Sequence, residues 1–144
     1  RNFKRMITFK MKTGLEGYEM TRAIREKYLS TGNADVHDTD ALHIAGYENG
    51  TVICSGRLYA RDNISCIIDN VTVDEDNRMQ YVGDTVLRAL EDRAVGMMKA
   101  IVRITPTEES RGFFEAEGYI GKDEMKKDLT KVRGCRGCGG GAKK

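Results

Sequence analysis

The stretch of the chain with the greatest capacity for chemistry runs from Asp69 to Asp84, where an apolar segment passes through an acidic loop into an amphipathic pattern. The first backbone N–H groups of a helix lack partners within the helix and lie at the positive end of its dipole, so together they favour a bound phosphate. Gly83 would let the backbone approach phosphate oxygens closely, and Arg78 or Gln80 would hold the turn or the charge. An ordinary strand-to-helix connection with a packing glycine has the same pattern, so the residues alone leave both interpretations open.

The four cysteines offer thiol chemistry. Cys135 and Cys138 form a CRGC motif in a Gly-rich tail, with the spacing of zinc ligands or of a redox pair. A structural zinc site needs four ligands, and Cys54 and Cys66 fall in apolar stretches. The sequence therefore predicts no metal site, with Cys135 and Cys138 as the pair closest to one. This use of cysteine fits a reducing compartment better than a disulfide-built fold.

Hydrophobic periodicity predicts the elements that position these residues. They are a strand over residues 5–12, a helix over 16–29, a loop over 30–40, strands over 42–47, 52–59 and 64–73, an acidic loop over 74–77, a helix from 82 to Gly96, a strand over 101–104, a helix over 108–117 and a strand near 119–125. Asn49-Gly50 predicts a type I′ hairpin turn between two antiparallel strands. The β-branched residues of 64–73 predict a central strand, and Thr107 is predicted to cap the helix that follows it.

Length and charge narrow the class of protein. A chain of 144 residues normally makes one domain, and we expect it over residues 1–132, with a Gly/Cys/Lys-rich tail over 133–144. The net charge of +2, from 24 Lys and Arg against 22 Asp and Glu, is too small to indicate nucleic acid or an anionic membrane as a partner. No apolar run reaches the roughly 18–20 residues of a membrane helix, and the start lacks a signal peptide. These features predict a cytoplasmic protein.

Residues 69–84 resemble motif A of the GNAT superfamily of acyltransferases. That motif is a strand ending in apolar-x-Val, an acidic or Pro loop, and Arg/Gln-x-x-Gly-x-Gly/Ala at the start of a helix. Arg78 and Gly83 match it, whereas Tyr81 stands where the first Gly is usual. The run GFFEAEGY over 112–119 is similar to the superfamily's Phe-Tyr-Glu-Lys-x-Gly-Phe, and residues 40–58 resemble its front half. The similarity covers residues 6–124 in one collinear order.

The resemblance implies an α/β (α+β) GNAT fold: a central mixed, mostly antiparallel sheet of six to seven strands, flanked by about four helices and split into a V-shaped cleft between residues 69–73 and 101–105. It also implies the direct transfer of an acetyl or similar acyl group from acetyl-CoA to an amine, carried by a small molecule or a peptide. No metal is implied, and enzymes of this resemblance often form homodimers.

The same resemblance implies roles for individual residues. Backbone groups of Val71 and Val73 would pair with the pantetheine arm, and one such N–H would stabilise the oxyanion of the tetrahedral intermediate. Phe113 and Phe114 would flank the thioester. The pyrophosphate would lie on Arg78, Met79, Gln80, Tyr81, Val82, Gly83 and Asp84, with Thr85. Thr107 and Ser110 stand where the family often has an Asn and an Ala beside the coenzyme.

Direct transfer needs a base for the amine and an acid for the departing thiolate. Similar enzymes often carry a carboxylate near Asp69, which makes it the first candidate for the base, although a carboxylate there can also form a local salt bridge. His43 is an alternative base, but a lone His on a strand is more often a packing residue. The family's usual acid, a Tyr, maps to Phe114, so Tyr81 or Tyr119 would have to replace it.

Two functions follow from these departures. One is an active acyltransferase, and the other is a catalytically weak CoA-binding sensor or interaction module with the same fold, which Phe114 favours. The acceptor pocket in such folds is built by the variable front segment, here residues 15–40. Its acidic residues hint at a cationic acceptor.

Overall fold

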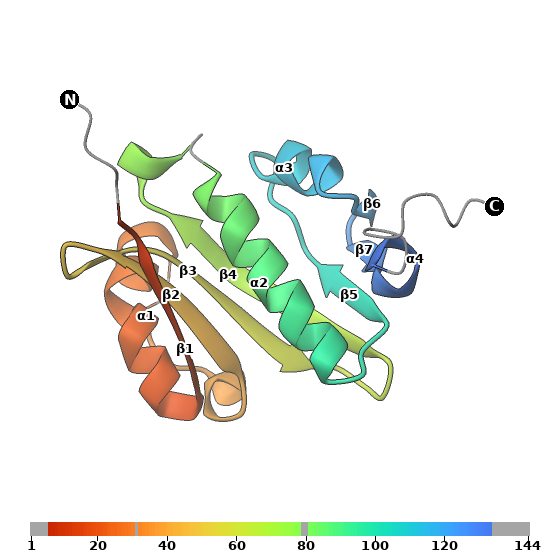
Figure 1. The fold of residues 1–144 in the computed structure, drawn as a ribbon, viewed down its shortest axis with the longest axis horizontal. Coiled ribbons are helices and arrows are strands. Elements are labelled where there is room, and N and C mark those ends of the chain that lie inside the picture. The colour runs from red at the N-terminus through yellow and green to blue at the C-terminus, as the bar shows by residue number, and fades with distance from the viewer. Residues whose placement is uncertain (1–5, 31, 79–80, 134–144) are drawn as a thin grey trace. The chain divides into compact units, whose positions relative to one another are not determined.

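The structure is a computed structural model that describes residues 6–30, 32–78 and 81–133. Its elements in chain order are labelled in Figure 1. They are β1 (Thr8–Thr13), α1 (Gly14–Tyr28), the 3₁₀ helix η1 (Val36–Thr39), β2 (Leu42–Glu48), β3 (Thr51–Ala60), β4 (Ser65–Val73), the 3₁₀ helix η2 (Glu75–Asn77), α2 (Val82–Gly96), β5 (Ile101–Ile104), α3 (Arg111–Ala116), β6 (Ile120–Gly121), β7 (Met125–Asp128) and α4 (Leu129–Arg133).

The strands found in the described residues form one mixed sheet of seven, in the order β1-β2-β3-β4-β5-β7-β6. The pairs β1/β2, β2/β3, β5/β7 and β6/β7 are antiparallel. β4 and β5 pair in parallel, with Ser65–Ile67 opposite Ile101–Arg103, and α2 supplies the crossover that a parallel pair requires. The mixed, mostly antiparallel sheet with four α-helices confirms the predicted fold class, and the central place of β4 confirms the expectation for residues 64–73.

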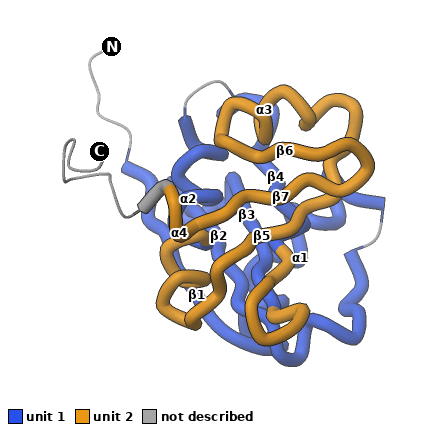
Figure 2. The backbone as a smooth tube through the Cα atoms, turned by 90° about the vertical axis from the view of Figure 1, so that its right-hand side faces the viewer, with its two compact units in different colours: residues 1–59, 68–90 blue, residues 60–67, 91–144 orange. Residues whose placement is uncertain are grey.

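Two compact units make up the chain, and Figure 2 colours them separately. Unit 1 comprises residues 1–59 and 68–90, and unit 2 comprises residues 60–67 and 91–144. Unit 1 thus holds β1, β2, most of β3, the later part of β4, α1 and the first part of α2. Unit 2 holds the first residues of β4, the end of α2 and all elements from β5 onward.

The core of unit 1 depends on close contact between its sheet and α2. Val86, Leu87 and Leu90 of α2 are fully buried, as their helical spacing predicts. Gly56 of β3 faces them, and a Cβ there would lie 2.8 Å from Leu90 Cδ1 and 2.9 Å from Val86 Cγ1. Only glycine therefore lets the helix approach this strand so closely.

The β2–β3 hairpin turns as its sequence predicts. Asn49 has a φ of 54° and Gly50 a φ of 81°, and a type I′ turn requires positive φ at both positions. The register places Glu48 opposite Thr51, directly beside the turn. The prediction from Asn49-Gly50 is confirmed.

A buried polar cluster joins three elements of unit 2. Glu91 of α2 is only 1% exposed, and it accepts a hydrogen bond from Tyr119 Oη at 2.7 Å and from Lys127 Nζ at 3.2 Å. Burial and the charge of Glu91 both raise the pKa of Tyr119 far above its usual range. The paired Lys127 compensates the carboxylate, as a buried charge requires.

Several predicted boundaries were wrong. The helix predicted over 108–117 is the shorter α3, because Thr107 Oγ1 accepts from Ser110 N and Thr107 N donates to Ser110 Oγ, which forms a turn instead of a helix start. The loop over 30–40 contains η1, which a capping box between Asp35 and Asp38 stabilises. The single strand near 119–125 is the pair β6 and β7, and α4 was not predicted.

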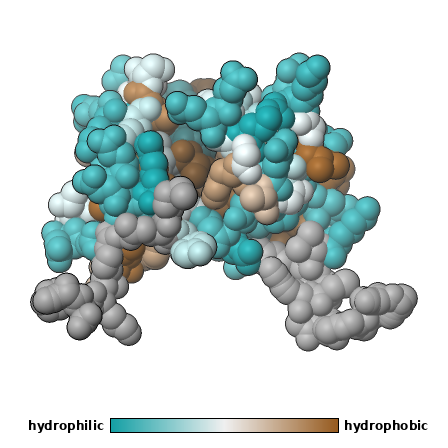
Figure 3. Space-filling view, turned by 90° about the horizontal axis from the view of Figure 1, so that it is seen from above, coloured by the Kyte–Doolittle hydropathy of each residue, from teal (hydrophilic) through white to brown (hydrophobic). Residues whose placement is uncertain are grey.

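The face of the molecule in Figure 3 is largely hydrophilic, and its hydrophobic side chains occupy small separate areas. Large apolar side chains that are exposed, such as Met98 at 84% and Ile120 at 71%, come from different elements. Scattered exposure of this kind is normal for a soluble surface and indicates no binding face. Within the described part of the chain, no helix combines the length and the apolar character needed to cross a membrane.

Candidate functional site

The loop that follows β4 is closed by its own hydrogen bonds and by one to β3. Asp74 N donates to Ile53 O at 2.7 Å, and Asn77 N donates to Asp74 O at 2.8 Å. Arg78 Nε donates to Val73 O at 2.8 Å across the loop. Arg78 therefore holds the turn, one of the two roles that its sequence position predicts.

Tyr28, the last residue of α1, also holds this loop. Its Oη donates to Asp74 Oδ1 at 2.8 Å and accepts from Glu75 N at 2.9 Å. The Arg78 guanidinium lies 5.1 Å from the centre of the Tyr28 ring, within the range of a cation–π contact. Lys27 Nζ adds an ion pair to Asp74 Oδ1 at 3.0 Å.

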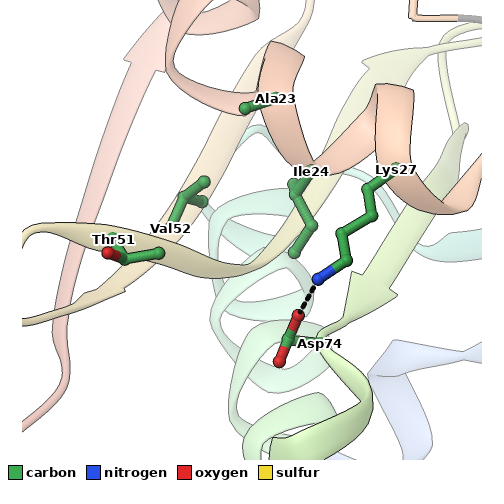
Figure 4. Close-up of a pocket in the computed structure, with 6 residues that line it drawn as sticks. All are labelled: Ala23, Ile24, Lys27, Thr51, Val52 and Asp74. Atoms are coloured by element: carbon green, nitrogen blue, oxygen red, sulfur yellow. Dashed lines mark hydrogen bonds and ion pairs between the residues drawn. The ribbon is translucent and has the colours of Figure 1, made fainter.

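A small open pocket lies between α1 and β3 beside this loop (Figure 4). Its volume is about 170 Å³, and its walls are mostly apolar. The Lys27–Asp74 ion pair lies at one side of it, drawn as the dashed line in Figure 4. Residues lining the pocket are Ala23, Ile24, Lys27, Thr51, Val52 and Asp74. At this point α1 is thus joined to the loop by individual polar contacts rather than by continuous packing.

The start of α2 has an unusual backbone. Tyr81 has a φ of 64°, and its side chain is exposed. A residue with a Cβ adopts this left-handed conformation at a cost of roughly 1–2 kcal/mol, whereas glycine adopts it freely. Tyr81 therefore keeps, at a cost, the conformation suited to the glycine that the resembling motif has here. Thr85 N and Oγ1 both donate to Tyr81 O, which fixes the first turn of α2.

The other residues predicted around this loop are placed unequally. Val71, Val73, Gly83 and Asp84 are half-buried, Val82 is buried, and Thr85 is exposed. Met79 and Gln80 lie outside the described residues. Asn70 interrupts the extended geometry of β4 with a φ of 52°, which asparagine tolerates better than most residues. The backbone groups of Val71 and Val73 follow directly after this irregular point.

Asp69, the candidate base, is held by Arg57 of β3. Arg57 Nε donates to Asp69 Oδ1 at 2.8 Å and Arg57 Nη2 to Asp69 Oδ2 at 2.9 Å, a bidentate pair. The Asp69 side chain keeps 32% of its surface exposed. The local salt bridge that the sequence allows is thus present, and proton transfer by Asp69 stays a prediction.

Arg57 belongs to a buried charge network in unit 1, formed by Arg25, Asp35, Asp38, Arg57 and Asp69. Asp38 is fully buried, and its Oδ1 accepts from Arg25 Nη1 at 2.9 Å and from Arg57 Nη1 at 3.0 Å. Arg57 Nη1 also donates to Asp35 Oδ1 at 2.7 Å. Three carboxylates thus surround two guanidinium groups.

The pKa values of the network follow from these contacts. Burial alone would raise the pKa of Asp38, but hydrogen bonds from Arg25, the Asp35 amide and Arg57 outweigh it and hold that pKa well below its usual range. The same balance of burial against Arg57 lowers the pKa of Asp35. Burial would lower the pKa of Arg57, but its carboxylate partners raise it further. Every member of this group for which a shift is given is therefore stabilised as an ion.

His43 lies beside this network and is fully buried. Its Nε2 is 3.4 Å from Asp38 O and 3.6 Å from Asp38 Oδ1. Burial lowers the pKa of His43, more than the nearby Asp38 raises it. A neutral, enclosed imidazole fits the packing role that the sequence leaves open better than the alternative role of a base.

Unit 2 contains the other predicted site residues. Thr107 and Ser110 hydrogen-bond to each other, with 3.0 Å between their hydroxyl oxygens. The ring of Phe114 is buried and packs edge-on against Phe113 at 5.1 Å and Tyr119 at 5.6 Å between centroids. The proton of Tyr119 is already donated to Glu91, so Tyr119 does not fit the role of the missing acid.

The thiols that the structure describes are buried. Burial raises the pKa of Cys54 and of Cys66 to about 11, which makes both unreactive at neutral pH. Among the residues with a described position, no three His, Cys, Asp or Glu side chains are grouped to hold a metal ion. Cys135 and Cys138 lie outside the described residues.

The contacts of Tyr28 and Arg57 were not predicted. Tyr28 lies 46 residues before its partner Asp74, and Arg57 lies 19 residues after Asp38. A signal existed only for Arg57, because a charged residue inside the apolar segment 52–59 needs a partner if the strand is buried.

Comparison with solved structures identifies the fold. No family model matches the sequence. Escherichia coli ElaA is 20% identical with a TM-score of 0.68, over 85% of this chain and 100% of that one. An acetyltransferase of the GNAT family from Staphylococcus aureus is 11% identical with a TM-score of 0.66, over 86% and 99%.

A third similar structure was solved with ligands. N-acetylglutamate synthase from Neisseria gonorrhoeae, complexed with coenzyme A and L-arginine, is 12% identical with a TM-score of 0.68, over 88% of this chain and 34% of that one. Similarity at these identities extends to the arrangement of the elements. The fold of this chain is that of the GNAT N-acetyltransferases.

Proposed function

We propose that this protein is an acyltransferase that moves an acetyl or similar acyl group from acetyl-CoA to an amine. The observation that carries the proposal is the loop from Val73 to Arg78 with the left-handed Tyr81 at the start of α2. It combines a fixed cation with the N-terminus of a 15-residue helix, which suits a pyrophosphate. The fold, and the coenzyme A complex of one similar protein, support the same reaction.

Each part of this site has a proposed task. The N-terminal N–H groups of α2 and Arg78 would bind the pyrophosphate, and the backbone of Val71 and Val73 would hold the pantetheine arm. Bound acetyl-CoA supplies the thioester whose carbonyl carbon the amine attacks. Asp69 would accept the amine proton, and Tyr81, whose side chain is exposed, would protonate the thiolate. The contacts of Thr107, Ser110, Phe113 and Phe114 with the coenzyme stay predictions from the resemblance.

Binding of CoA is the first test of this proposal. CoA at about 100 times its dissociation constant should add roughly 2.7 kcal/mol to the free energy of unfolding, because it binds only the folded state. Differential scanning fluorimetry should show this as a melting temperature several degrees higher. Gly83→Val should abolish the shift, since a branched side chain at the helix start would occupy the space of the phosphates.

Ala89→Val is the matched control, because it places the same side chain in the middle of α2. It should keep the CoA shift while sharing any cost of a β-branched residue in a helix. An unchanged melting curve of the wild-type protein in millimolar CoA would refute the proposed function.

The alternative function is a CoA-binding sensor with little catalysis. Phe114 supports it, because the resembling enzymes usually have a Tyr there. Incubation with acetyl-CoA and a panel of polyamines, amino acids, aminoglycosides and peptides separates the two. Thiol release that depends on an added amine supports the enzyme, whereas CoA binding without release on any amine supports the sensor.

A further inference from the structure

We propose that Tyr28 is a positioning residue for CoA binding, acting through the loop from Val73 to Arg78. This inference rests on the proposed function and adds a residue outside the resembling motif. Tyr28 is the last residue of α1, and its phenol reaches two consecutive residues of the loop, Asp74 and Glu75. Its ring also lies against Arg78, the cation proposed for the pyrophosphate.

The hydroxyl of Tyr28 has two functions in this contact. It donates to the Asp74 carboxylate at 2.8 Å and accepts from the Glu75 amide at 2.9 Å, so one oxygen fixes both a side chain and the backbone of the loop. Asp74 in turn caps η2 by accepting from Asp76 N at 3.4 Å. Removal of the hydroxyl therefore loosens the segment that leads to Arg78.

Little else joins α1 to the loop here. The pocket of about 170 Å³ separates Ala23 and Ile24 of α1 from Thr51 and Val52 of β3, directly beside Asp74. Lys27 provides the other contact, but its side chain is 61% exposed, and an exposed ion pair contributes little. The Tyr28 hydroxyl thus orients the loop with no packing to replace it.

The variant Tyr28→Phe tests this role. It deletes both hydrogen bonds and keeps the ring under Arg78. We expect the dissociation constant for CoA to rise about five- to tenfold by isothermal titration calorimetry, the effect of losing hydrogen bonds to a charged partner. The titration is done well below the melting temperature, where circular dichroism shows the variant fully folded, because a merely structural role then leaves the dissociation constant unchanged.

The control is Tyr47→Phe, which removes a hydroxyl from β2, opposite Thr8 and away from the loop. It should bind CoA as the wild type does. A second variant, Asp74→Ala, removes the partner of the same hydroxyl, and adding Tyr28→Phe to it should weaken binding less than Tyr28→Phe does alone.

Three results would overturn the inference: Tyr28→Phe binding CoA within twofold of the wild type, Tyr47→Phe losing as much affinity, or the two losses at Tyr28 and Asp74 adding in full. If Tyr28→Phe does not fold, Asp74→Ala decides alone, and CoA binding at wild-type strength would overturn the inference. Failure of the wild type to bind CoA at all is a different result, since it refutes the proposed function itself.

Discussion

Asp38→Asn is expected to lower the free energy of unfolding by about 3–5 kcal/mol, a large part of the total stability of a small domain. Asn has nearly the volume of Asp, so the change tests charge rather than packing. It leaves Arg25 and Arg57, whose side chains are 3% and 4% exposed, with one carboxylate fewer. Buried guanidinium groups without a compensating charge are the source of the loss.

Urea denaturation measures this loss without adding salt. Glu26→Gln is the matched control, because it removes a carboxylate from the exposed pair with Arg22, where both side chains are about half exposed. That change should cost less than about 1 kcal/mol. A similarly small loss for Asp38→Asn would show that the buried network contributes little to stability.

The network also sets a pH dependence. Because the pKa values of Asp35 and Asp38 are lowered in the folded state, their stabilising effect is complete above the unfolded carboxyl pKa of about 3.9 and is lost as pH falls below it. The lowered pKa of His43 acts at higher pH, since the unfolded state begins to bind a proton below about pH 6.5. Urea midpoints should therefore fall between pH 6.5 and 5, and again below pH 4. Asp38→Asn should flatten the second decline.

Asp69→Asn is expected to lower turnover of a productive amine by about 10²–10⁴-fold, the usual contribution of a general base. The amide cannot accept the proton, but its oxygen can still accept one hydrogen bond from Arg57. The shift in melting temperature caused by CoA should remain, since the proposed task of Asp69 lies in proton transfer. Initial rates of thiol release over a pH series give the measurement.

Asp35→Asn controls for disturbance of Arg57, because Asp35 shares that arginine and its side chain is 49% exposed. If Asp69 acts only as the partner of Arg57, the two variants should lose similar activity. Turnover of Asp69→Asn within about threefold of wild type, at every pH, would assign the base elsewhere.

Local patterns predicted the fold because each depends on neighbours in the chain. The spacing of Val82, Val86, Leu87 and Leu90 predicted α2, and Asn49-Gly50 predicted its turn, since periodicity and turn chemistry act over a few residues. The helix expected from residue 108 was too long because Glu108 and Glu109 suit a first turn. The side chains of Thr107 and Ser110 bond to the backbone instead, an outcome that propensity does not weigh.

The candidate site was predictable only in part. The resemblance marked Arg78 and Gly83, but the partner of the Arg78 side chain, Tyr28, comes from a helix 50 positions earlier. Likewise, Asp69 was identified as a carboxylate of interest, while its partner Arg57 is known only from the fold. Contacts of this kind form when separate elements meet, so one sequence without its structure does not contain them.

The division of the chain has a consequence for its synthesis. The chain passes between the two units three times, after residues 59, 67 and 90, so neither unit is a continuous segment. Unit 1 is complete once residue 90 has left the ribosome, and N-terminal units generally fold first. Residues Ser65–Ile67, however, wait for their parallel partners Ile101–Arg103. Until then the nascent chain carries an unpaired strand edge, and a chaperone that protects such edges would act between the emergence of residue 67 and that of residue 103.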